Sequence, residues 1–194
     1  MSHSVLSASA SARWLRCPPS ARLCESLPQT ESVYATEGTN AHALCAYKLG
    51  QLVGQPQPAP LVDFDEQAYQ CADDYVAFVA ERIKKESQVL IEQKLDFSKW
   101  APEGFGTADC IVLCDGTMHI IDYKHGMGVP VSAEDNSQLK LYALGALDTF
   151  GCLYDINTVE LSIFQPRISN SNSWELSVES LMSWANEVLK PMAQ

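Results

Sequence analysis

The sequence has no long apolar segment and no excess of positive charge. Its longest uncharged hydrophobic run, around Cys110 to Cys114, is far shorter than the roughly 20 residues that a membrane-spanning helix needs. Only 13 Lys and Arg face 24 Asp and Glu, which gives a net charge of −11. This balance argues against broad, non-specific coating of nucleic acid, so any nucleic-acid contact is expected to be local.

The seven cysteines form no C-x-x-C pair and stand at irregular positions, without a signal-peptide-like apolar stretch. A secreted disulfide framework is therefore not expected, and a self-contained zinc site is disfavoured. Cys110 and Cys114 are interpreted as strand residues. The cysteine pattern favours a reducing compartment, and we expect a cytoplasmic protein with no membrane partner.

The size and composition suit one mixed α/β domain, because 194 residues of which 46% are hydrophobic can bury a sizeable core. A serine N-cap and the following Pro18-Pro19 predict a short helix over residues 10–16. Apolar residues at helical spacing predict helices over residues 37–51 and 66–86, the last being the longest. The segment GQPQPAP at residues 54–60 predicts a surface loop. We expect the helix at 37–51 to end near Gly50.

The periodicity then changes to that of strands, and a mixed order of strands and helices follows. Asp135 or Asn136 can cap a helix that runs to Phe150, where Gly151 would end it. A last helix is expected to end at Pro191. The predicted strands cover residues 88–95, 107–114, 117–124, 158–165 and 174–178, and the last helix covers residues 177–189.

Asp115-Gly116 lies between two strand-like runs and predicts a tight hairpin turn. If Cys114 and Thr117 flank the turn, opposed residues have numbers that sum to 231, so Ile111 faces Ile120 and Asp109 faces Asp122. Directly opposed residues have Cβ atoms about 4.5–5.5 Å apart, which lets both carboxylates reach one divalent cation.

Strand alternation places Lys124 on the same face as Asp122. Buried charges are costly unless they are paired or bound to a metal, so this trio has two interpretations. It is either a metal-dependent site or a structural ion pair in which Lys124 neutralises the carboxylates.

Four short motifs occur in an order that resembles a known nuclease group. They are Glu37-Gly38-Thr39-Asn40-Ala41-His42, Gly106-Thr107-Ala108-Asp109, Asp122-Tyr123-Lys124 and Gln138-Leu139-Lys140-Leu141-Tyr142. In this order they resemble the RecB-like branch of the PD-(D/E)XK nuclease superfamily. The whole chain is similar to a phage-borne family of unassigned function that is related to CRISPR-associated adaptation exonucleases.

The resemblance implies a restriction-endonuclease-like αβββαβ core with extra N-terminal helices. Residues 1–194 would form a single RecB-like nuclease domain, in which residues 1–60 are an N-terminal helical segment and loop and residues 61–194 are the nuclease core.

The resemblance also implies roles for individual residues. His42, Asp109, Asp122 and the backbone carbonyl of Tyr123 would ligate Mg²⁺ or Mn²⁺, and Lys124 would orient or activate the attacking water. Asp109, Asp122 and Lys124 are the expected catalytic residues.

Other residues stay open to more than one interpretation. Gln138 and Tyr142, four residues apart on one helical face, would approach the substrate strand, although Tyr142 also suits ordinary packing. His42 also suits a half-buried structural histidine. Glu92 is interpreted as an exposed strand carboxylate outside the catalytic set, although it could support the site or a second metal.

The expected function is a metal-dependent deoxyribonuclease, specifically an exonuclease, that hydrolyses DNA phosphodiester bonds in phage or bacterial recombination or DNA processing. The alternative is a non-catalytic DNA-binding or protein-interaction module that retains the fold. DNA is the expected partner, in a bacterial or phage-infected cell. Iron–sulfur relatives pair an early cysteine, matching Cys17, with three later ones that this sequence lacks, so no such cluster is expected.

Overall fold

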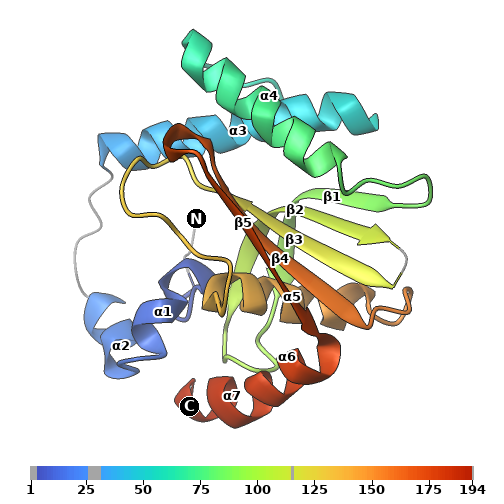
Figure 1. Ribbon diagram of the computed structural model, residues 1–194. Coiled ribbons are helices and arrows are strands. Elements are labelled where there is room, and N and C mark those ends of the chain that lie inside the picture. The colour runs from blue at the N-terminus through green and yellow to red at the C-terminus, as the bar shows by residue number, and fades with distance from the viewer. Residues whose placement is uncertain (1–3, 26–31, 115, 194) are drawn as a thin grey trace.

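The computed structural model describes residues 4–25, 32–114 and 116–193, which are arranged around a five-stranded sheet (Figure 1). Its strand order is β1-β2-β3-β4-β5. Neighbouring strands are antiparallel except β3 and β4, which are parallel. The strands are β1 (Gln88–Asp96), β2 (Phe105–Cys114), β3 (Thr117–Tyr123), β4 (Thr158–Gln165) and β5 (Asn170–Ser177). A mixed α+β sheet was predicted, and this part of the prediction is confirmed.

Helices cover both faces of the sheet (Figure 1). Helix α5 (Ser137–Phe150) connects β3 to the parallel β4 and lies on one face, together with the N-terminal and C-terminal helices. Helices α3 (Val33–Val53) and α4 (Glu66–Ala80) lie on the other face. The remaining helices are α1 (Ser11–Trp14), α2 (Pro19–Glu25), α6 (Val178–Trp184) and α7 (Lys190–Met192), and none of the described helices is long and apolar enough to cross a bilayer.

Each face of the sheet has its own hydrophobic core, because neighbouring side chains of a strand point to opposite faces. Ile111 of β2 and Ile120 of β3 pack toward α5, in a cluster that includes Leu139 and Leu144. Cys110, Val112 and Ile121 pack toward α3 and α4, in a cluster with members such as Leu44, Leu49, Tyr75 and Val79. The β2–β3 hairpin is therefore buried on both sides.

The predicted register of this hairpin is confirmed. Cys114 pairs with Thr117 and Ile111 with Ile120, so the paired numbers sum to 231. Gly116 has a φ of 75°, in the left-handed region, while Asp115 lies outside the described residues. The described ladder ends at Cys110 and Ile121, one step before the predicted pair of Asp109 and Asp122.

The helix lengths differ from the prediction. Helix α3 has 21 residues and α4 has 15, so α3 is the longer of the two. Helix α3 passes through Gly50 and ends at Gly54, whose φ of 70° is the left-handed conformation that glycine adopts readily. The chain leaves α4 after Ala80 because residues 81–87 form turns, where the Ser87 hydroxyl accepts the N–H of Lys84.

Pro191 does not end the last helix as predicted. Ser177 caps α6, and the chain continues through a π-helical turn, η3 (Ala185–Leu189), into α7. Pro191 lies inside α7, which follows the π-helical turn directly. The first predicted helix is present as a 3₁₀ turn, η1 (Ala8–Ala10), followed by α1.

Several other predictions are close to the observed structure. Helix α5 begins after Asn136, whose side chain accepts the N–H groups of Gln138 and Leu139, and it reaches Phe150 as expected. Strand β5 begins at Asn170, four residues before the predicted start at residue 174. A 3₁₀ turn, η2 (Pro166–Ile168), joins it to β4.

Candidate metal centre

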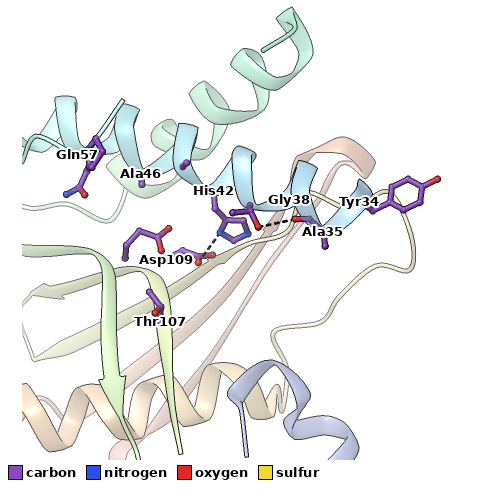
Figure 2. A pocket seen from close by; sticks show the side chains of 12 residues that line it. Tyr34, Ala35, Gly38, His42, Ala46, Gln57, Thr107 and Asp109 are labelled. Atoms are coloured by element: carbon purple, nitrogen blue, oxygen red, sulfur yellow. Dashed lines mark hydrogen bonds and ion pairs between the residues drawn. The ribbon is translucent and has the colours of Figure 1, made fainter. Parts of the chain in front are cut away.

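Three side chains with metal-binding groups meet between α3 and the sheet (Figure 2). They are His42 of α3, Glu92 of β1 and Asp109 of β2, and their ligand atoms all lie within 4.8 Å of one another. His42 Nδ1 is 3.1 Å from Asp109 Oδ1. A group of this kind can hold a metal ion, because carboxylate oxygens and an imidazole nitrogen are common ligands of divalent cations.

Asp109 reaches this position because the β2–β3 ladder stops beside it. If the register continued, Ala108 would lie opposite Tyr123 and pair with it through the backbone. Instead, the Asp109 carboxylate accepts the Tyr123 N–H at 2.7 Å through Oδ2. The other carboxylate oxygen, Oδ1, faces His42. The carboxylate therefore joins the end of the hairpin to α3.

Glu92 lies in the neighbouring strand at the same level. It falls between the pairs Ile91–Cys110 and Gln93–Ala108, which puts it opposite Asp109. Its φ is 49°, a left-handed conformation that non-glycine residues seldom adopt. Such backbone strain is often found at functional sites. The sequence predicts Glu92 as an exposed strand carboxylate outside the catalytic set, because only the β1–β2 register reveals that it faces Asp109.

These three candidate ligands line a pocket of about 610 Å³ (Figure 2). This volume falls within the range of small-molecule sites, roughly 300–1,000 Å³. One wall is formed by small side chains of α3, which leave the space beside His42 open. These α3 residues are Ala35, Gly38, Thr39, Ala43 and Ala46.

Asp122 and Lys124 form a second polar group beside this pocket. Asp122 is only 3% exposed, and its Oδ2 lies 2.9 Å from Lys124 Nζ. Gln138 of α5 contacts both partners: its Nε2 donates to Asp122 Oδ1 at 2.7 Å, and its Oε1 accepts from Lys124 Nζ at 3.1 Å. The Tyr142 hydroxyl is 3.3 Å from Gln138 Nε2.

The structure thus brings the predicted site residues to one end of the β2–β3 hairpin, but in two groups. His42 and Asp109 share the first group with Glu92. Asp122, expected as a ligand, lies outside that group and is paired with Lys124. Gln138 and the buried Tyr142, expected to contact substrate, lie against this ion pair. Tyr123, whose carbonyl was expected to bind the metal, is attached to Asp109 through its N–H.

The pKa values of the site residues are shifted because several carboxylates lie close together. Burial by itself would lower the pKa of His42, but the nearby charge of Asp109 raises it to about 9. Loss of hydration and the charge of Asp109 raise the pKa of Glu92 to about 7 and that of Asp122 to about 6. A divalent cation would relieve the same repulsion, and its binding would displace these protons.

The cysteines do not contribute to such a site. Cys45, Cys71, Cys110 and Cys114 are buried, and Cys17 and Cys152 are exposed. Within the described ranges, no cysteine belongs to a group of three or more clustered metal-binding side chains.

Comparison with protein families gives a match over residues 3–194, almost the whole chain. The chain belongs to the DUF2800 family. This family is described as "Protein of unknown function (DUF2800)". Among solved structures, that of SSO0001 matches the DUF2800 chain at 13% identity, over 92% of this chain and 86% of that chain, with a TM-score of 0.27. That TM-score is too low to support an argument about fold or function.

Proposed function

We propose that this protein is a divalent-metal-dependent deoxyribonuclease of the RecB-like PD-(D/E)XK type, acting as an exonuclease on DNA in bacterial or phage recombination or processing. The observation that carries the proposal is the cluster of His42, Glu92 and Asp109 in a pocket, with the Asp122–Lys124 pair at the same end of the β2–β3 hairpin. The site would act in the cytoplasm of a bacterial or phage-infected cell.

The order of elements supports the proposal. Three antiparallel strands, the helix α5 and then a strand parallel to β3 follow α4 along the chain. This order agrees with the αβββαβ core that the sequence motifs imply. The candidate residues lie at the end of an otherwise buried hairpin, where β2 and β3 stop pairing and the Asp109 carboxylate accepts the Tyr123 N–H.

The chemistry of the donors supports Mg²⁺ or Mn²⁺ as the metal. His42, Glu92 and Asp109 would hold the ion, since hard divalent cations take carboxylate oxygens and Mn²⁺ also accepts imidazole nitrogen. When bound, such an ion polarises a phosphodiester oxygen and lowers the pKa of a bound water.

Lys124 and the residues that hold it suit the stabilisation of charge on the phosphate during hydrolysis. Lys124 would place its ammonium beside the scissile phosphate, where it stabilises the charge that develops as water adds to phosphorus and the P–O bond breaks. Asp122 and Gln138 hold the Lys124 ammonium in one position. Hydrolysis would then leave a phosphate monoester on one product and a hydroxyl on the other.

The proposal is tested with linear end-labelled DNA and circular DNA incubated with Mg²⁺ or Mn²⁺. We expect stepwise degradation of the linear DNA and little attack on the circle. Lys124→Ala should reduce turnover by roughly 100-fold or more while retaining metal affinity, because one charge-stabilising donor typically contributes about 10²–10³ in rate. Lys99→Ala, which removes an exposed ion pair with Asp148, is the matched control and should leave turnover unchanged.

The outcomes separate the proposed enzyme from its alternative. Metal binding and DNA binding without cleavage by the wild-type protein would favour the non-catalytic module that retains the fold. Cleavage that Lys124→Ala leaves intact would remove Lys124 from the mechanism. Attack on circular DNA at the rate of linear DNA would replace the exonuclease with an endonuclease.

A further inference from the structure

A second charged cluster lies on the side of α3 that faces away from the pocket of His42. Glu37 of α3 accepts two hydrogen bonds through Oε1, from Arg167 Nη1 at 2.7 Å and from His125 Nε2 at 3.1 Å. Arg167 belongs to η2 and His125 follows β3, and their side chains are only 14% and 9% exposed. We call Glu37, His125 and Arg167 the brace, because they connect three segments that are distant in sequence.

The brace is continuous with the candidate metal centre through Tyr123. Burial lowers the pKa of His125, which favours the neutral ring. A carboxylate can only accept, so His125 Nε2 carries the proton and Nδ1 accepts from the Tyr123 hydroxyl at 2.9 Å. The Tyr123 ring packs edge-on against the His42 ring, with centroids 5.4 Å apart, and its backbone N–H donates to Asp109.

These contacts connect Glu37 to His42 in two ways. One is a series of side-chain contacts through His125 and Tyr123, and the other is the backbone of α3, which carries both Glu37 and His42. We propose that Glu37 is a positioning residue, which with His125 and Arg167 sets the rotation of α3 so that His42 faces Asp109. This inference rests on the proposed function insofar as His42 and Asp109 are metal ligands. A helix side-chain tip lies roughly 6 Å from the axis, so a rotation of about 20° moves it by about 2 Å. Such a shift would separate His42 from Asp109.

A role in stability alone is a weaker explanation of the brace. Glu37 is 43% exposed, and ion pairs near the surface contribute about 0–1 kcal/mol. Mutation of a group that orients a metal ligand has a different effect, because it typically lowers metal affinity about 10- to 100-fold. Metal affinity and protein stability therefore distinguish the two roles.

The experiment compares Glu37→Ala with a matched control, Asp73→Ala, which removes the ion pair between Asp73 of α4 and Lys48 of α3. Glu37→Ala removes two hydrogen bonds between α3 and neighbouring segments, and Asp73→Ala removes one ion pair, but only Glu37 is connected to His42. Mn²⁺ affinity is measured by calorimetry, and thermal unfolding is measured in chelator. We expect Glu37→Ala to weaken Mn²⁺ binding at least tenfold and Asp73→Ala to change it less than twofold, at similar melting temperatures.

Two further variants sharpen the test. Glu37→Gln keeps an acceptor oxygen for Arg167 and should restore most of the Mn²⁺ affinity. If Glu37→Ala does not fold, His125→Phe takes its place, since it removes the bond to Glu37 while keeping a ring beside Tyr123. Unchanged Mn²⁺ affinity in the folded variant would overturn the positioning role, as would equal losses in Glu37→Ala and Asp73→Ala.

A readout in the metal-free protein separates this inference from the proposed function. NMR of the His42 ring reports its hydrogen bond to Asp109, which we expect to be lost in Glu37→Ala and kept in Asp73→Ala. If the wild-type protein binds no Mn²⁺, the proposed function fails and the His42 signal alone decides the role of Glu37. If the His42 signal is identical in both variants and in the wild type, Glu37 does not position His42.

Discussion

At the scale of single residues, Glu92 combines an unfavourable backbone with a position that suits a metal ligand. Its left-handed φ of 49° costs energy for a side chain with a Cβ, and loss of hydration together with the neighbouring charge of Asp109 raises its pKa. Neither feature benefits the fold. A metal ion would compensate for the charge repulsion, which gives a physical reason for a carboxylate at this position.

If Glu92 binds the metal ion, Glu92→Gly should differ from a matched control variant in metal affinity. Glu103 is also exposed and left-handed, with a φ of 56°, but it lies outside the candidate site. Glycine relieves the strain at either position and also gains freedom in the unfolded chain, so we expect both variants to stay within about 1 kcal/mol of the wild-type stability. Only Glu92→Gly should lower Mn²⁺ affinity, by about tenfold or more in a calorimetric titration. Equal Mn²⁺ affinity in the two variants would remove Glu92 from the ligand set.

Residue patterns predicted part of this site and missed the rest. The hairpin turn and its register located Asp109 and Asp122 near each other, and the motif order placed His42 with them. Glu92 was missed as a member of the cluster because its position depends on how β1 pairs with β2. The loop between these strands has no sequence feature that fixes their register. The pairing of Asp122 with Lys124 and Gln138 depends on side-chain rotamers, which spacing along the chain does not determine.

At the scale of elements, α3 carries both His42 and the small residues that open the pocket, so its two internal glycines are informative. A Cβ at Gly38 would meet no atom within 4 Å, because the pocket lies beside it. A Cβ at Gly50 would clash with the Gln55 carbonyl oxygen, where the chain folds back after the helix. The same substitution should therefore have opposite effects at the two positions.

We expect Gly38→Ala to raise the free energy of unfolding by up to about 1 kcal/mol, the helix preference of alanine over glycine. Gly50→Ala should lower it by roughly 1–3 kcal/mol, because the chain after α3 must move to relieve the clash. Urea denaturation of both variants measures the difference. A stabilising Gly50→Ala would show that α3 does not end against residues 54–57 as the structure has it.

The sequence predicted most elements but not all of their ends. Strands of alternating or buried apolar residues, and the cap at Asn136, were recognised because these signals are local. The end of α3 was placed at Gly50 rather than Gly54, since both are glycines and only the packed chain shows which one is left-handed. Pro191 was taken as a helix end because the π-helical turn before it leaves no mark in the sequence.

Across the protein as a whole, a half-buried ion cluster joins the end of α4 to the sheet. Arg82 Nε is 2.7 Å from Glu160 Oε1 of β4, and Arg82 Nη2 donates to Ser173 of β5. His119 of β3 lies 3.5 Å from the other carboxylate oxygen of Glu160. Hydrogen bonding to His119 and to Arg82 lowers the pKa of Glu160 from 4.5 to about 2.

This pKa shift predicts how stability depends on pH. Because the folded-state pKa lies below the unfolded value, ionised Glu160 stabilises the fold fully above about pH 4.5, and this stabilisation is lost as the pH falls toward 2. Glu160→Gln should therefore be less stable than the wild type by about 1–3 kcal/mol at pH 7, with the difference shrinking between pH 4.5 and 2. Urea denaturation of both proteins across this range measures it. A difference that stays constant with pH would contradict the role of the charge.

The most direct test of the account is the position of a bound metal ion. Crystals soaked in Mn²⁺ and measured near the manganese absorption edge would locate the ion by its anomalous scattering. We predict one peak about 2.0–2.3 Å from ligand atoms of His42, Glu92 and Asp109, the distance typical of small divalent cations. An additional contact from Asp122 would show that its ion pair with Lys124 opens when the metal binds. A fully loaded crystal without a peak between His42, Glu92 and Asp109 would contradict the metal centre, and with it the proposed nuclease.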